Sequence, residues 1–153
     1  MRPLAALFAA LLLTAFSADA ADAAERRDTA PQHRGNTMNL GINGRQFPVD
    51  LADNAAARAF AALLPLTLEM SDLHGNEKYR RLGARLPSRP ENPGRVRAGD
   101  LMLFGDDCVV LFYKDFDTGY SYTRIGRLKD AAGLAAAAGR GAVTAEFSLG
   151  ASE

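Results

Sequence analysis

Apolar and polar residues alternate in two short segments of the chain. Residues 66–70 (LTLEM) and residues 143–149 (VTAEFSL) carry apolar side chains at alternate positions. Because successive side chains of a strand point to opposite faces, this period indicates strands with one buried face and one exposed face. In the first segment we expect Leu66, Leu68 and Met70 to point inward.

Two pairs of neighbouring apolar segments predict β-hairpins. Residues 38–42 and 45–49 are separated by Asn-Gly, which favours a two-residue turn because both positions tolerate positive φ. Residues 101–104 and 108–114 are separated by Gly-Asp-Asp, a length and composition that also suit a hairpin. Residues 108–114 are nearly all apolar, so we expect a central strand that is covered on both faces. Residues 120–128 predict one further strand.

Two Ala-rich segments predict short helices, because alanine has the highest helix propensity. The first covers residues 55–64 and follows Asp53 and Asn54, either of which can cap its first turn. Pro65 ends it, since proline lacks the N–H and its ring clashes with the preceding turn. The second covers residues 131–138 and is closed by a glycine that can adopt the left-handed conformation.

The pattern is less regular between the strands at 66–70 and 101–104. Residues 79–82 (YRRL) fit either a strand or one helical turn, and the pattern does not separate the two. Residues 87–99 (PSRPENPGRVRAG) hold three of the seven prolines and predict a long excursion on the surface. The predicted fold is mainly β: an antiparallel sheet of about eight short strands with two short helices, closed into a barrel that leaves no exposed edge.

The N-terminus has the pattern of a secretory signal peptide. Arg2 precedes an unbroken apolar run over residues 4–16, and Ala18 and Ala20 match the small-residue rule for cleavage. The run is shorter than the roughly 20 residues needed to span a bilayer, so we expect no stable membrane anchor. Cleavage after Ala20 and cleavage after Ala23 both remain open.

The chain therefore divides into three predicted regions. Residues 1–20 form the signal peptide, and residues 21–36, which are polar and aperiodic, form a disordered leader. Residues 37–150 form the β-barrel domain. This organisation predicts a periplasmic or secreted protein.

Composition narrows the expected partners and chemistry. The 18 basic and 18 acidic residues cancel, and no basic run stands out, so we expect no nucleic-acid partner. The two histidines and the single cysteine are too scattered to predict a metal site, and we expect no cofactor. Cys108 has no second cysteine with which to form an internal disulfide, and its apolar neighbours predict a buried thiol.

Three stretches, taken in order, carry a family resemblance. They are residues 42–79 (INGRQFPVDLADNAAARAFAALLPLTLEMSDLHGNEKY), 98–114 (AGDLMLFGDDCVVLFYK) and 120–128 (YSYTRIGRL). They resemble the cyclophilin-like fold families of small bacterial proteins, from about Leu40 to Phe147. The resemblance implies a β-barrel related to peptidyl-prolyl isomerases, found alone, exported or appended to flavodoxin-like domains, with no activity generally assigned. The chain lacks the Phe-His-Arg run and the Gln-Gly-Gly-Asp loop of true cyclophilins, and it has no Trp.

The candidate site lies where aromatic residues gather around one arginine. Strand alternation places Tyr120, Tyr122 and Arg124 on one face of the predicted strand at 120–128. A proline ring needs a hydrophobic cup, and its isomerisation needs a cation or N–H donor, which Arg124 could supply. The alternative is that Arg124 lies at the barrel surface over aromatic stems. The full set of candidate ligand-binding residues is Arg124, Tyr122, Tyr113, Phe104, Met70 and His74.

Three hypotheses for the function follow. The first is a non-catalytic module that binds a peptide or a small molecule. The second is a divergent peptidyl-prolyl isomerase or folding helper, and no catalytic residue is assigned for it. The third is a barrel that supports a protein partner. The resemblance carries a fold, and a fold does not by itself imply a function.

Overall fold

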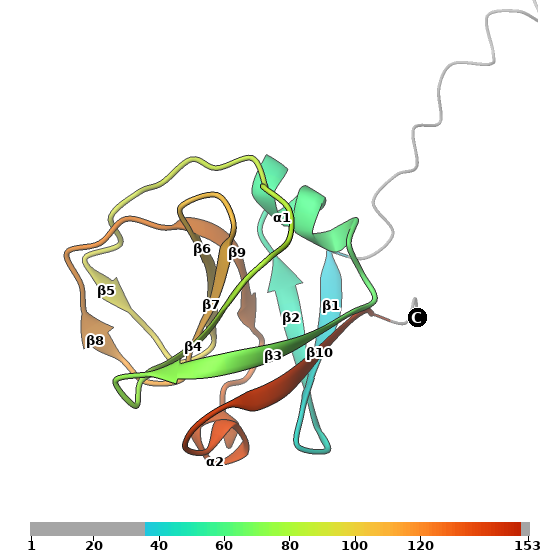
Figure 1. Cartoon of the computed structure of the whole chain (residues 1–153), viewed down its shortest axis with the longest axis vertical. Helices are drawn as coiled ribbons and strands as arrows, with labels where there is room; N and C mark the ends of the chain where they lie inside the picture. The colour runs from blue at the N-terminus through green and yellow to red at the C-terminus, as the bar shows by residue number, and fades with distance from the viewer. Residues whose placement is uncertain (1–35, 151–153) are drawn as a thin grey trace, which may run out of the picture. The chain divides into compact units, whose positions relative to one another are not determined.

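Eight antiparallel strands close into a barrel in the computed structural model, which describes residues 36–150 (Figure 1). The bounds of the barrel strands are β1 Thr37–Ile42, β2 Arg45–Leu51, β3 Leu66–Leu73, β4 Glu77–Arg81, β6 Asp100–Phe104, β7 Cys108–Phe112, β9 Thr123–Leu128 and β10 Val143–Leu149. Their order around the barrel is β1-β10-β3-β4-β7-β6-β9-β2. The predicted mainly β fold with a closed barrel is confirmed. The predicted signal peptide (1–20) and nearly all of the predicted leader (21–36) lie outside the described residues.

Both predicted hairpins are present. In the first, Ile42 pairs with Arg45 across a turn in which Asn43 and Gly44 have φ values of 48° and 77°. In the second, Phe104 pairs with Cys108. The ambiguous segment at 79–82 belongs largely to β4, because residues 77–81 pair along their length with β7.

Two short helices cover the ends of the barrel. Helix α1 (Ala55–Ala61) is capped by Asn54, whose Oδ1 accepts a hydrogen bond from the Ala57 N–H at 2.8 Å. Helix α2 (Leu134–Ala138) begins three residues later than predicted, because Gly133 adopts a left-handed conformation with φ of 79° immediately before it. No helix in the described part of the chain is long and apolar enough to cross a membrane.

The barrel interior is filled by inward-facing side chains from every barrel strand. Phe60 of α1 packs edge-on against Phe147 of β10, with ring centroids 5.3 Å apart. The predicted inward positions of β3 are Leu66, Leu68 and Met70; the last two are buried and Leu66 is partly buried against the same core. Met70 is therefore a core residue with no exposed surface.

A second apolar cluster lies on the outer face of β6 and β7, where two segments cross over them. Residues 87–99 form a covering strap, and within it the short strand β5 (Arg95–Val96) pairs with β8 (Phe116–Asp117). Figure 1 shows this two-stranded ribbon standing beside the barrel. The cluster consists of Val96, Met102, Cys108, Val110, Phe112 and Tyr122. Strand β7 is therefore buried on both faces, as its apolar sequence predicts.

Strand β9 is shorter than predicted. We expected a strand over residues 120–128, whereas β9 begins at Thr123. Tyr122 forms an isolated antiparallel bridge with Glu91 of the strap instead, through two backbone hydrogen bonds of 2.9 Å. The strap thus pairs with the residue that precedes β9.

Candidate functional site

The structure separates the six predicted site residues. Met70 is buried in the barrel core. Tyr113 is also buried, and its hydroxyl donates a hydrogen bond of 2.6 Å to Oδ1 of Asp72. Phe104, His74 and Tyr122 line one pocket on the outer face of the barrel. Arg124 lies outside this pocket.

We call this cavity the aromatic pocket. Its volume is about 480 Å³, and its base is the outer face of β4, β7 and β6. Strand alternation brings Glu77, Tyr79 and Arg81 of β4 to that face, while Lys78 between them points inward. The segment 116–120 forms the opposite wall. Its aromatic lining consists of Tyr79, Phe104, Phe116, Tyr120 and Tyr122.

The rings of the aromatic pocket contact one another edge-on or tilted. Phe104 lies 6.0 Å from Tyr120 at an interplanar angle of 90°, and 5.8 Å from Tyr122. Tyr122 is only 6 % exposed, whereas Phe104 is 42 % and Tyr120 is 66 % exposed. Burial raises the pKa of the Tyr122 hydroxyl. The pocket therefore has a fixed aromatic base and two solvent-exposed rings at its rim.

Most of the charged groups around the aromatic pocket are already paired. Arg81 lies 2.7 Å from Oδ1 of Asp107, and Asp117 lies 2.7 Å from Arg95. Glu77 has no ion-pair partner within residues 36–150. Burial raises the pKa of its carboxyl group. Glu77 is therefore the carboxylate of this pocket that has no ion-pair partner, and the nearby His74 acts on it only through its charge, which lowers the pKa of Glu77.

The thiol of Cys108 also lines the aromatic pocket, from the end of β7. It is buried, as its apolar neighbours predict, and it is a free cysteine. Burial raises its pKa, so little thiolate is present at neutral pH. We assign it a packing role.

Arg124 belongs to a different network. Its guanidinium lies 3.4 Å from Oδ1 of Asp100, and Arg127 donates to the same oxygen at 2.9 Å. Oδ2 of Asp100 accepts the Arg97 N–H at 2.9 Å, so this buried carboxylate is fully engaged. The Arg124 side chain is 45 % exposed. Arg124 therefore lies at the barrel surface in an ion-pair network and does not line the aromatic pocket.

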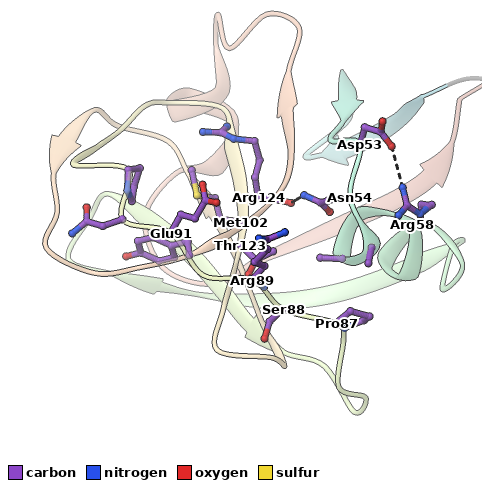
Figure 2. A pocket seen from close by; sticks show the side chains of 15 residues that line it. Asp53, Asn54, Arg58, Pro87, Ser88, Arg89, Glu91, Met102, Thr123 and Arg124 are labelled. Carbon is purple, nitrogen blue, oxygen red and sulfur yellow. Dashed lines mark hydrogen bonds and ion pairs between the residues drawn. The ribbon is translucent and has the colours of Figure 1, made fainter.

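A second cavity of about 530 Å³ contains Arg124 and Tyr122 together (Figure 2). It lies between the start of α1, the strap and the start of β9. Polar and apolar groups contribute about equally to its surface, and Arg58 there is already paired with Asp53 at 3.0 Å. Figure 2 shows the Arg124 side chain extending away from Arg89, so the arginines do not converge on one point. Its charged side chains therefore do not form a single binding point, whereas the rings of the aromatic pocket contact one another.

Sequence reasoning missed Asn76, Glu77 and the wall at 116–120. The alternation Glu77-Lys78-Tyr79-Arg80-Arg81 would have revealed an outward face if residues 77–81 had been assigned to a strand. The wall carried no such signal, because its position depends on pairing between β5 and β8. Within residues 36–150, no three His, Cys, Asp or Glu side chains gather as a metal site would require.

Comparison with known proteins supports the fold. A family model described as "Cyclophilin-like family" matches residues 40–148. The solution structure of the hypothetical protein AF2241 from Archaeoglobus fulgidus is similar, with 16 % sequence identity and a TM-score of 0.53. The match covers 79 % of this chain and 99 % of that chain. At this identity the likeness shows the fold alone. No curated protein matches the chain.

Proposed function

The chain belongs to the cyclophilin-like family, and we propose that it is an exported, non-catalytic module that binds a peptide or a small molecule on the outer face of its barrel. The aromatic pocket is the binding site in this proposal. Its volume of about 480 Å³ is within the usual range for ligand sites. Its lining combines aromatic side chains with a few polar groups, which is typical of such sites.

The observation that carries the proposal is the exposure of two rings at the pocket rim. Phe104 and Tyr120 are 42 % and 66 % exposed. Few other large apolar side chains among the described residues are as exposed to solvent. Exposed aromatic surface beside a concavity is typical of a recognition site, because a ligand removes that surface from water. The edge-on contact between the two rings holds them together at the rim of the pocket.

Export is the second part of the proposal. It is supported by the predicted signal peptide at residues 1–20, whose apolar run and Ala-x-Ala site follow a charged start. The test is to produce the tagged full chain in a Gram-negative bacterium and to measure the mass of the periplasmic product. Cleavage after Ala20 or Ala23 supports export. Full-length protein confined to the cytoplasm contradicts it.

Binding is tested by a thermal-shift screen of the purified protein against peptides and metabolites. A ligand specific for the folded state raises the melting temperature by mass action. Hits are then titrated by calorimetry against the double variant Phe104→Ala/Tyr120→Ala and against Leu149→Ala. Leu149 is a matched control, since it is 61 % exposed and lies outside the pocket. Loss of binding in the double variant alone supports the site, whereas equal binding in all three proteins contradicts it.

A further inference from the structure

We propose that the aromatic pocket recognises a primary alkylammonium group, as carried by a lysine side chain or by a free diamine. This inference rests on the proposed binding function and names its ligand class. It is carried by one juxtaposition: five aromatic side chains and one carboxylate without a cation partner line the same pocket.

The charges around the pocket leave one negative group without a partner. Arg81 and Asp117 both line the pocket, and each is paired at 2.7 Å with an opposite charge. These two pairs cancel, so they add no net charge to the site. Glu77 is the remaining carboxylate of the lining, and no cation of the described residues forms an ion pair with it. The pocket therefore holds one carboxylate that is not in an ion pair.

The position of Glu77 makes that charge costly in the unliganded protein. It opens β4 on the outer face, two residues from Tyr79 and directly across from the buried Phe112 of β7. Burial among these groups disfavours the ionised carboxylate, which is why its pKa is raised. A ligand cation that pairs with Glu77 removes this cost. The recognition is thus selective for charge and not only for apolar surface.

The aromatic lining favours the same ligand. The faces of Phe and Tyr rings are negative, so a desolvated cation is attracted to them. Within this fold two amines already lie over a ring: the ammonium groups of Lys78 and Lys114 lie 5.1 Å and 6.0 Å from the ring centroid of Tyr113. The aromatic pocket offers five rings and no lysine. An ammonium group from outside the chain would fill that role.

The carboxylate of Glu77 narrows the choice to an ammonium that carries N–H groups. A carboxylate accepts charge-assisted hydrogen bonds. A primary ammonium has three donors for them, whereas a quaternary ammonium has none. Glu77 therefore favours the primary amine.

Two basic groups near Glu77 set the conditions of the test. Arg81 is paired with Asp107 and its side chain is 71 % exposed, so its charge is compensated and screened. His74 is exposed in the turn between β3 and β4, and its charge lowers the pKa of Glu77 against the effect of burial. All probes are therefore compared at one pH, pH 8, so that the charges of these groups are the same in every titration.

The experiment titrates the purified protein by calorimetry with defined probes. The two sources of the ammonium group are represented by 1,5-diaminopentane and by the peptide acetyl-Gly-Lys-Gly-amide. Acetyl-Gly-norleucine-Gly-amide has a similar stem without the charge, and tetramethylammonium has the charge without donors. We expect the lysine peptide or the diamine to bind at least about tenfold more tightly than both comparison probes, which corresponds to about 1.4 kcal/mol.

Two carboxylate variants separate a pocket effect from a general charge effect. Glu77→Gln should weaken binding of the preferred amine about tenfold, again about 1.4 kcal/mol. Glu146→Gln removes an exposed carboxylate on β10, outside the pocket, and should leave binding unchanged. Thermal unfolding of both variants verifies that they are folded. An equal loss in both would overturn the assignment of Glu77.

The outcomes also distinguish this inference from the proposed function. Equal affinity for the norleucine and lysine peptides, lost in Phe104→Ala/Tyr120→Ala, overturns the ammonium specificity and leaves the binding site standing. Tighter binding of tetramethylammonium overturns the role given to Glu77 as a hydrogen-bond acceptor. If no amine binds while the wider screen yields a ligand dependent on Phe104, the inference fails alone. If neither yields a ligand, both fail.

Discussion

The ammonium group of Lys78 lies 2.8 Å from Oδ1 of Asp72, and no part of the Lys78 side chain is exposed. The same oxygen accepts the hydroxyl of Tyr113 at 2.6 Å. Lys78 also donates to the carbonyl oxygens of Gly139 and Gly141, at 2.9 Å and 2.6 Å. These hydrogen bonds connect the β3–β4 hairpin to the segment between α2 and β10. They close one end of the barrel with polar groups.

We expect Lys78→Met to destabilise the fold by about 3–5 kcal/mol, because it removes the buried cation that pairs with Asp72 and takes a donor from the carbonyl groups of Gly139 and Gly141. Urea unfolding measures the change. Lys114→Met is the control, since Lys114 lies over the same Tyr113 ring but is exposed. It should change the unfolding free energy by less than about 1 kcal/mol. Similar losses in the two variants would show that Lys78 contributes only through the ring.

Tyr113 should ionise at a higher pH than an ordinary tyrosine, and its ionisation should lower the stability of the fold at alkaline pH. Burial, followed by its hydrogen bond to Asp72, raises its pKa to about 12. The folded state thus favours the neutral phenol, and this contribution is complete below pH 10 and is lost as the pH rises toward 12. Tyr113→Phe should remove the last tyrosinate step in an absorbance titration at alkaline pH. An unchanged titration curve would contradict the assignment.

At neutral pH the same variant should lower the unfolding free energy by about 1.5–3 kcal/mol, the usual range for one hydrogen bond to a charged group. Asp72 keeps its bond to Lys78, so the loss is smaller than that of Lys78→Met. The bonds from Lys78 and then Tyr113 lower the pKa of Asp72. Their stabilisation is therefore present above the ordinary carboxyl pKa and is lost as the pH falls through the lowered value.

The barrel could be predicted from sequence because its strands are local patterns. Alternation in β3 and β10 and the Asn-Gly turn after β1 each specify structure over a few residues. The Lys78 network could not be predicted, since its acceptors lie 61 and 63 residues away along the chain. A lysine at an inward position of a predicted strand would be buried without a partner. From sequence alone, Lys78 therefore argues against a strand at residues 77–81.

The candidate site was only partly predictable, for a related reason. Phe104, Tyr122 and His74 do line one pocket, as an aromatic cluster would suggest. Arg124 shares the outer face with Met102, its partner on β6, yet it turns to Asp100. What divides these residues between two cavities is the strap at 87–99. Its course depends on the long-range bridge between Glu91 and Tyr122.

Asp100 should contribute more to stability than either arginine that it binds. Its side chain is buried and accepts the Arg97 N–H as well as both guanidinium groups. Asp100→Ala should cost about 2–3 kcal/mol, because a backbone donor loses its acceptor together with the charged bonds. Arg124→Ala should cost less than about 1 kcal/mol, since Arg127 remains in place. A larger loss for Arg124→Ala in chemical unfolding would contradict this order.

Glu77 should lower the stability of the fold at neutral pH if it serves a ligand. Burial raises its pKa, so the folded state prefers the protonated carboxyl, and this preference is lost as the pH rises through the raised value. Glu77→Gln imitates the protonated form. It should therefore raise the melting temperature relative to wild type more at pH 7 than at pH 4. Glu146→Gln, on an exposed part of β10, should show no such difference.

We expect no prolyl isomerase activity above background in a protease-coupled assay with proline peptides. The aromatic pocket supplies a hydrophobic cup, but Arg124 lies in another cavity. The arginine that does line the pocket, Arg81, is held by Asp107 at 2.7 Å and is not free to polarise a bound amide. A measurable rate would contradict the non-catalytic assignment. If that rate fell in Arg81→Ala but not in Arg124→Ala, the aromatic pocket would be the catalytic site and the pair with Asp107 would have to open.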